Sequence, residues 1–136
     1  MGAGRHSMDG ESRRMTGKRV VILDIPAPCA FINSNDRTHR MAQAKLTKTW
    51  RAAAKQAAAN VAPLTPPVHI TAHIWKPRGG RYDPGNLYPT AKALVDGLVD
   101  AGIFADDDHK HVIGPDMRHG GIGNPEIILE ITERKA

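Results

Sequence analysis

One apolar segment, residues 87–101, constrains the fold of this chain more than any other. Its apolar side chains recur at the spacing of one helix face, which is made of Leu87, Ala91, Leu94, Val95 and Leu98. Gly102 follows as a natural C-terminal stop, and either Asn86 or Thr90 can cap the start, with Pro89 tolerated near the first turn. The pattern therefore predicts a helix over residues 87–101 with one buried face.

Acidic residues stand on both sides of this predicted helix. Asp83 precedes it, and the run Asp106, Asp107 and Asp108 follows it. Acids gathered in an otherwise basic chain suggest a divalent-metal site, because Mg²⁺ takes oxygen ligands, usually one or two carboxylates together with substrate phosphate oxygens. A plainer interpretation remains open, in which Asp83 and the later run simply form turns.

The remaining elements predict one α+β domain over residues 19–136. A helix is expected over residues 37–60, which are rich in Ala, Lys and Gln, with Asn35 or Asp36 as its N-cap. Apolar, β-branched runs predict strands at residues 19–25, 68–75, 112–113 and 126–132. The order β-α-β-α-β-β implies a mixed or antiparallel sheet. Residues 1–18 are small, polar and basic, which predicts a disordered leader or a cloning remnant.

The overall charge favours an anionic partner. The net charge is +5 and the pI is about 9.7. The single cysteine, Cys29, excludes a disulfide within the chain and suits a reducing compartment, so we expect a cytoplasmic protein. No apolar run approaches the roughly 18 residues that a membrane span needs.

Three groups of basic residues are candidates for binding phosphate. The first lies at the start of the 37–60 helix, where backbone N–H groups favour anions: Arg37, His39 and Arg40. The second lies along the outer face of that helix, with cations and no anion: Lys45, Lys48, Arg51 and Lys55. The third is a loop that leads into Asp83: Lys76, Arg78 and Arg81. These groups favour nucleic-acid binding, although a charged helix face or a helix cap can also be merely solvated.

Taken together, these residues resemble the RusA-type Holliday junction resolvases, small endonucleases common in phages and prophages. The resemblance covers nearly everything from Val20 to Thr132. The matching residues are Asn35-Asp36-Arg37, the helix of residues 45–51, Asp83 with Asn86-Leu87, Lys92, and Gly102 followed by Asp106-Asp107. The resemblance implies a homodimer that binds four-way DNA junctions and cuts two opposing strands with Mg²⁺, for which Mn²⁺ can substitute.

The resemblance also implies roles for single residues. Asp83 and Asp107 match the family's essential aspartates, as catalytic residues and metal ligands, with Asp106 beside Asp107 in the metal site. Lys92 matches a functional lysine if residues 88–90 are an insertion; the plainer interpretation is a surface lysine that pairs with Asp96. The family motif usually reads Asp-x-Asp-Asn, and Gly85 stands at its second aspartate, so one ligand carboxylate is missing.

These observations predict a Mg²⁺-dependent, structure-selective endonuclease, a crossover junction endodeoxyribonuclease weakened by Gly85. The alternative is a junction- or DNA-binding protein with little or no cleavage, and a weaker third interpretation is a basic nucleic-acid-binding module whose acids only form turns.

The spacing of the acids also predicts how the metal site is shared between chains. The helix between Asp83 and the later acids would be about 22 Å long, and the six residues from its end to Asp107 reach at most about 21 Å. We therefore expect Asp83 of one protomer to lie near Asp106 and Asp107 of its partner.

Overall fold

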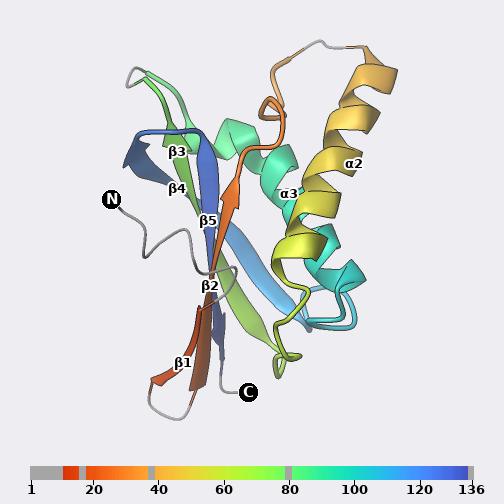
Figure 1. The fold of residues 1–136 in the computed structure, drawn as a ribbon, viewed down its shortest axis with the longest axis vertical. Helices are drawn as coiled ribbons and strands as arrows, with labels where there is room; N and C mark the ends of the chain where they lie inside the picture. Colours follow the sequence, from red (N-terminus) through yellow and green to blue (C-terminus); the bar gives the residue numbers. More distant parts are fainter. Residues whose placement is uncertain (1–10, 16–17, 37–38, 79–80, 135–136) are drawn as a thin grey trace.

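A mixed sheet of five strands forms the frame of the structure, a computed structural model that describes residues 11–15, 18–36, 39–78 and 81–134 (Figure 1). The strands are β1 (Glu11–Met15), β2 (Lys18–Pro26), β3 (Val68–Lys76), β4 (Val112–Ile122) and β5 (Glu126–Glu133). Their order is β1-β2-β5-β3-β4, with β3 and β4 parallel and the other neighbours antiparallel. The predicted α+β class is confirmed, and the sheet is of the mixed type.

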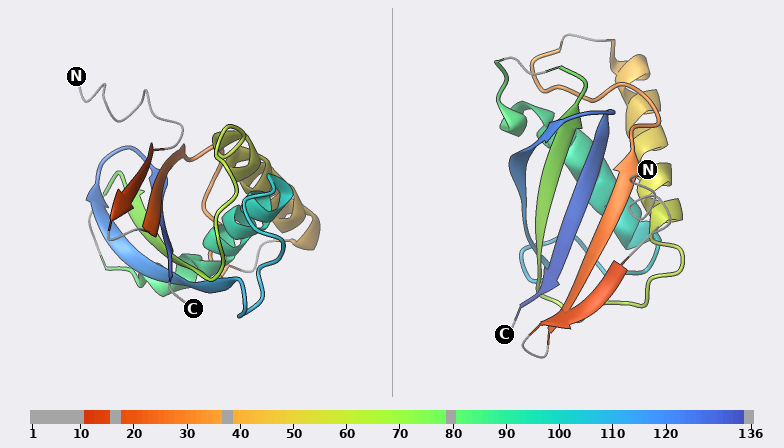
Figure 2. Two further views of the ribbon diagram at one scale, coloured as in Figure 1. Left: turned by 90° about the horizontal axis from the view of Figure 1, so that it is seen from below. Right: turned by 60° about the vertical axis from the view of Figure 1, so that its left-hand side comes forward.

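Among the described residues, two α-helices lie on the same side of this curved sheet (Figure 2). They are α2 (Arg40–Ala57) and α3 (Tyr88–Asp100), and a short 3-10 helix, η1 (Pro84–Leu87), leads directly into α3. From β2 onward the elements follow the predicted order β-α-β-α-β-β. Alternate strand side chains face the helices and join Trp50 of α2 and Leu94 and Leu98 of α3 in one core.

The first strand lies in the segment for which the sequence predicted a disordered leader. Residues 11–15 pair antiparallel with β2, from Glu11 beside Ile22 to Met15 beside Lys18. Sequence patterning misses this strand because it has no apolar alternation, whereas a strand at the edge of a sheet needs only backbone hydrogen bonds to its neighbour. Residues 1–10 and 16–17 of the predicted leader lie outside the described residues.

The start of α2 differs from the predicted cap. The helix begins after His39, whose Nδ1 accepts the Met41 N–H at 3.2 Å. Asn35 and Asp36 precede this point by several residues, so neither is the N-cap that the sequence predicted. The sequence misplaced the cap because Asn and Asp are preferred at such positions, and histidine is not among the usual capping residues.

The start of α3 also differs from the prediction, whereas its end agrees. Leu87 is the N-cap residue, and its apolar side chain has no acceptor for a capping hydrogen bond; η1 forms the preceding turn. Neither Asn86 nor Thr90 caps the helix, and the cap of η1 is Asp83. Gly102 adopts a φ of 81° just past the helix, which confirms the predicted glycine stop.

Strand β4 extends far beyond the predicted strand at residues 112–113. Glycines at its end look like a loop in the sequence, but close packing requires them. A Cβ at Gly120 would lie 2.6 Å from Nε1 of Trp75, and one at Gly121 would lie 2.6 Å from Cζ3 of the same ring. The Trp75 side chain of β3 therefore packs against the backbone of β4, an arrangement that only residues without a Cβ allow.

The two helices meet at an equally close contact, and replacing Gly97 by alanine is expected to destabilise the fold. A Cβ at this position would lie 2.3 Å from the backbone oxygen of Arg51 and 2.8 Å from Cβ of Ala54. Because backbone atoms cannot rotate away, α2 and α3 must separate, and we expect a loss of about 3 kcal/mol in the free energy of unfolding. Urea denaturation measures this loss. Gly123→Ala is the matched control, since its Cβ would meet Trp75 at an ordinary 3.5 Å. Equal midpoints for the two variants would contradict the close contact.

Candidate active site

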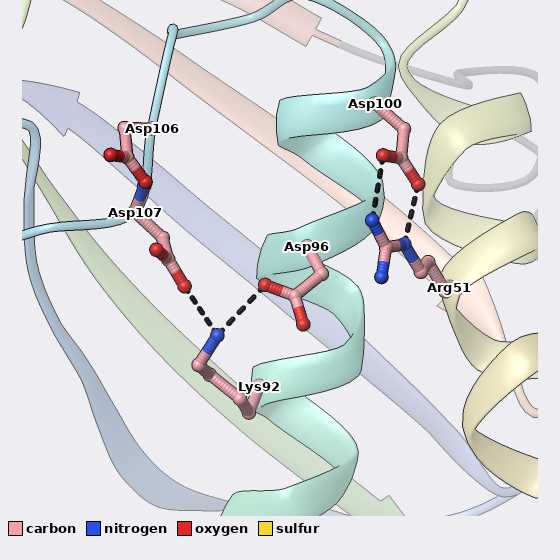
Figure 3. Close-up of polar contacts among 6 residues, drawn as sticks. All are labelled: Arg51, Lys92, Asp96, Asp100, Asp106 and Asp107. Carbon is pink, nitrogen blue, oxygen red and sulfur yellow. Dashed lines mark hydrogen bonds and ion pairs between the residues drawn. The ribbon is translucent and has the colours of Figure 1, made fainter. Parts of the chain in front are cut away.

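Lys92 of α3 lies between two carboxylates from different parts of the chain (Figure 3). Its Nζ donates to Oδ1 of Asp96 at 2.8 Å and to Oδ2 of Asp107. The Asp107 backbone N–H donates in turn to Oδ1 of Asp106 at 2.7 Å. The plainer pairing of Lys92 with Asp96 and the contact with Asp107 are therefore both present. The structure unites two predicted site residues, Lys92 and Asp107, with Asp106 adjoining them.

The packing of α3 explains why these side chains meet. The helix buries Ala91, Leu94, Val95 and Leu98, which leaves Lys92 and Asp96 half-buried one turn apart. After Gly102 the chain is anchored by Ile103, whose N–H donates to the Leu98 oxygen at 3.1 Å and whose oxygen accepts the Leu64 N–H at 2.9 Å. The following residues then run beside α3 and bring Asp107 to Lys92 (Figure 3).

Lys92, Asp96 and Asp107 together form what we call the Lys92 centre, and its lysine and Asp107 are held in their charged forms. Partial burial acts to lower the pKa of Lys92, but the hydrogen bonds to Asp107 and Asp96 outweigh it, and the pKa lies above its ordinary value. The hydrogen bond from Lys92 lowers the pKa of Asp107 below its ordinary value, against the opposing effect of desolvation. The side chain of Lys92 is 42% exposed and that of Asp107 is 28% exposed. A charged ligand in solvent can therefore reach the centre.

Asp83 lies at the other end of α3, in the turn that precedes it. Its Oδ1 accepts the Gly85 N–H at 2.9 Å, so Asp83 caps η1, as the plainer turn interpretation proposed. A Cβ at Gly85 would lie 3.2 Å from Oδ1 of Asp83. The turn is a 3-10 helix rather than an extended segment. A side chain at position 85 would therefore start beside the Asp83 carboxylate.

Two neighbouring segments hold the turn that carries Asp83. On one side the Tyr82 hydroxyl forms a 2.6 Å hydrogen bond with Nδ1 of His119 in β4, and Nζ of Lys76 lies 4.1 Å from the centre of the Tyr82 ring. On the other side the Ser34 N–H donates to the Asn86 oxygen at 2.8 Å. Sequence analysis identified Lys76 but missed Tyr82 and His119, because no local spacing links residues 37 positions apart.

The candidate carboxylates have the oxygen atoms that a hard cation binds, but within one chain Asp83 does not join Asp106 and Asp107 in a single group. Asp83, Asp106 and Asp107 offer the oxygen ligands that Mg²⁺ prefers, and Asp107 already binds a cation, the Lys92 ammonium group. Among the residues described, however, no group of three or more His, Cys, Asp or Glu side chains could hold a metal ion. The predicted meeting of Asp83 with Asp106 and Asp107 of a partner stays a prediction.

The basic face of α2 divides into two halves. No side chain in residues 40–49 is buried, and Arg40, Lys45 and Lys48 are exposed there with no acidic partner within the described part of the chain. Arg51, in the second half, is paired instead: its Nε and Nη2 donate to the two carboxylate oxygens of Asp100 at 2.6 and 2.9 Å (Figure 3). The face itself carries no anion, as the sequence shows, but α3 supplies one at Arg51.

The pairing of Arg51 with Asp100 has a tertiary cause. Asp100 lies 49 residues from Arg51 and reaches it only because α3 packs on α2. The hydrogen bond from Arg51 lowers the pKa of Asp100, and the charge of Lys55 contributes in the same direction. The free positive charge of α2 is therefore concentrated in its first half. Of the other predicted phosphate-binding residues, Arg78 and Arg81 are exposed, His39 caps α2, and Arg37 lies outside the described residues.

Two comparisons with known proteins were negative. A scan against models of known protein families finds no match, and a search of curated proteins finds no similar sequence. Within the described residues, the helices are too short or too polar to cross a membrane.

Proposed function

We propose that this protein is a metal-dependent endonuclease that cuts branched DNA, as its resemblance to the RusA-type resolvases implies. The contact between Lys92 and Asp107 carries this proposal. These two residues are 15 positions apart, each matches a functional residue of the family on its own, and they meet in one charged, partly exposed centre. A purely structural turn at residues 106–108 would not require that contact.

The chemistry assigned to the residues follows from their charges. Mg²⁺, or Mn²⁺ in its place, would supply charge neutralisation and an activated water for phosphodiester hydrolysis. Asp83, Asp106 and Asp107 are the residues that would hold it, with two symmetric sites in a homodimer. The Lys92 ammonium group can exchange its hydrogen bond with Asp107 for one with a phosphate oxygen of the DNA. Its hydrogen bond to Asp96, one helical turn away, can remain.

The alternative is a junction-binding protein with little or no cleavage. Two observations favour it: position 85 has no carboxylate, and the described residues contain no group of three acids that could hold a metal. The two functions differ in one assay, which measures binding and cleavage of a synthetic four-way junction and of a linear duplex, each with and without Mg²⁺. An endonuclease cuts the junction only with metal. Tight junction binding without cleavage at any Mg²⁺ or Mn²⁺ concentration establishes the alternative, and failure to distinguish junction from duplex contradicts both.

The division of charge on α2 predicts which cations contact DNA. Lys45→Gln and Lys48→Gln should each reduce the magnitude of the slope of log affinity against log salt concentration by about 0.9. This is the value for one lost phosphate contact on duplex DNA. Lys55→Gln is the matched control on the same helix and should reduce the slope less, because Lys55 lies near Asp100. Filter binding at several salt concentrations measures the slopes. Slopes equal to that of the wild type in Lys45→Gln and Lys48→Gln would remove the first half of α2 from the DNA interface.

A further inference from the structure

Thr90 makes an unusual pair of hydrogen bonds from inside the protein. It lies in the first turn of α3 and is fully buried, at 0% exposure. Its Oγ1 accepts the N–H of Ile32 at 2.7 Å and its hydroxyl donates to the oxygen of Ile32 at 2.9 Å. One side chain thus satisfies both backbone polar groups of a residue 58 positions away. Because Ile32 is itself buried, these groups have no ready access to water.

The segment that Thr90 holds connects two parts of the proposed site. Residues 27–36 run from β2 toward α2, whose N-cap is His39. Beside the Thr90 contact, the Ser34 N–H donates to the oxygen of Asn86, which lies in the same 3-10 turn that Asp83 caps. The loop that leads to the basic start of α2 is therefore fastened to the turn that carries Asp83.

The other side of this loop is fixed to α2 itself. Nε1 of Trp50 donates to the Ala30 oxygen at 2.9 Å, and its ring stacks on Phe31 with 5.6 Å between centroids. Trp50 ties the loop to α2, and Thr90 ties it to α3. Without the Thr90 hydroxyl, the buried N–H and C=O of Ile32 lose their partners, and the loop must move to find others.

We propose that Thr90 is a positioning residue, which keeps the basic start of α2 at a fixed place relative to Asp83. This inference rests on the proposed endonuclease function, because it concerns how bound DNA is aligned with the acids. Phosphate binding through several cations tolerates a small shift of the loop. Phosphodiester cleavage does not, since a displacement of about 1 Å can cost roughly 10²-fold in rate. Thr90 is therefore expected to affect cleavage far more than binding.

The test compares Thr90→Val, which keeps the shape but loses the hydroxyl, with Thr90→Ser, which keeps the hydroxyl. Amide hydrogen exchange of Ile32 and Ser34 reports the loop directly and needs no activity. In Thr90→Val both amides should exchange faster, cleavage of a saturating junction should fall roughly 10²-fold, and the dissociation constant should change little. Thr90→Ser should match the wild type in amide exchange, in cleavage rate and in dissociation constant. Ile70→Val, a buried change in β3, is the control for lost stability and should alter neither the exchange of Ser34 nor the ratio of cleavage to binding.

Two results overturn the inference. One is unchanged protection of Ser34 in Thr90→Val, which would mean that the hydroxyl does not hold the loop. The other is faster amide exchange in Thr90→Val together with equal fold losses in cleavage rate and in junction affinity. That result would leave Thr90 with a structural role only. If the wild-type protein neither binds nor cuts junctions, the proposed function is wrong, and the exchange measurement still decides whether Thr90 fastens the loop to the Asp83 turn.

Discussion

Asp107→Asn is expected to reduce junction cleavage by about 10³-fold, because metal-based charge stabilisation is worth several kcal/mol and about 1.4 kcal/mol corresponds to a tenfold change in rate. Asparagine keeps the shape of the side chain and an oxygen that can still accept from Lys92, but it loses the charge that binds a cation. Junction binding should be unchanged or tighter, since one negative charge is removed from a surface that meets phosphates. Single-turnover cleavage and binding of the same junction measure the two effects separately.

Asp108→Asn is the matched control for this experiment. Asp108 belongs to the same acidic run, but its Oδ1 forms a 2.5 Å hydrogen bond with Nδ1 of His111 and accepts the Lys110 N–H at 3.1 Å, within its own turn. Its loss should leave cleavage within about threefold, the scale of an exposed ion pair. Similar losses in both variants would mean that the run serves as a structural turn. Full activity in Asp107→Asn would remove the Lys92 centre from the proposed site.

The structure separates what local spacing can predict from what only packing reveals. The buried face of α3, its glycine stop and the pairing of Lys92 with Asp96 all follow from the helical repeat, because the interacting residues lie within a few turns of each other. The sequence order of strands and helices follows equally from apolar, β-branched runs and from helical spacing. Strand β1 does not, since its only apolar residue is Met15 and its pairing depends on a neighbouring strand edge.

The candidate site shows the same division. The sequence identifies Asp83 and Asp107 as acids that flank a helix, and the resemblance adds Lys92, but the contact between Lys92 and Asp107 depends on the path of the chain after α3. Asp100 neutralises Arg51, and Thr90 holds Ile32, across 49 and 58 residues. A threonine has the same local preferences whether it caps a helix or bridges two segments, so the sequence offers Thr90 only as one of two cap candidates, beside Asn86. Such long-range roles have no signal in a single sequence.

Gly85→Asp is expected to give the largest gain of function. The Cβ position at Gly85 lies 3.2 Å from Oδ1 of Asp83, and no left-handed backbone conformation stands in the way of a side chain. A carboxylate there would therefore stand beside that of Asp83, and two adjacent negative charges repel each other unless a cation lies between them. The variant should consequently be less stable than the wild type in chelator and should recover stability as Mg²⁺ is added, because a ligand that binds only the folded state stabilises it. Thermal unfolding across a Mg²⁺ titration measures this dependence without any DNA.

Cleavage should follow the same dependence on metal. Adding one charged ligand should lower the Mg²⁺ concentration for half-maximal cleavage by roughly tenfold, since ligand charge tunes the affinity of oxygen sites for hard cations. Without metal, junction binding should weaken, because the added charge repels phosphate. Gly85→Asn is the control, with the same size and no charge, and it should show neither the metal-dependent stability nor the faster cleavage. If Gly85→Asp cuts no faster than the wild type at any Mg²⁺ concentration, position 85 is not a ligand position. The alignment of this turn with the family motif is then wrong, even though a Cβ at position 85 would lie beside Asp83.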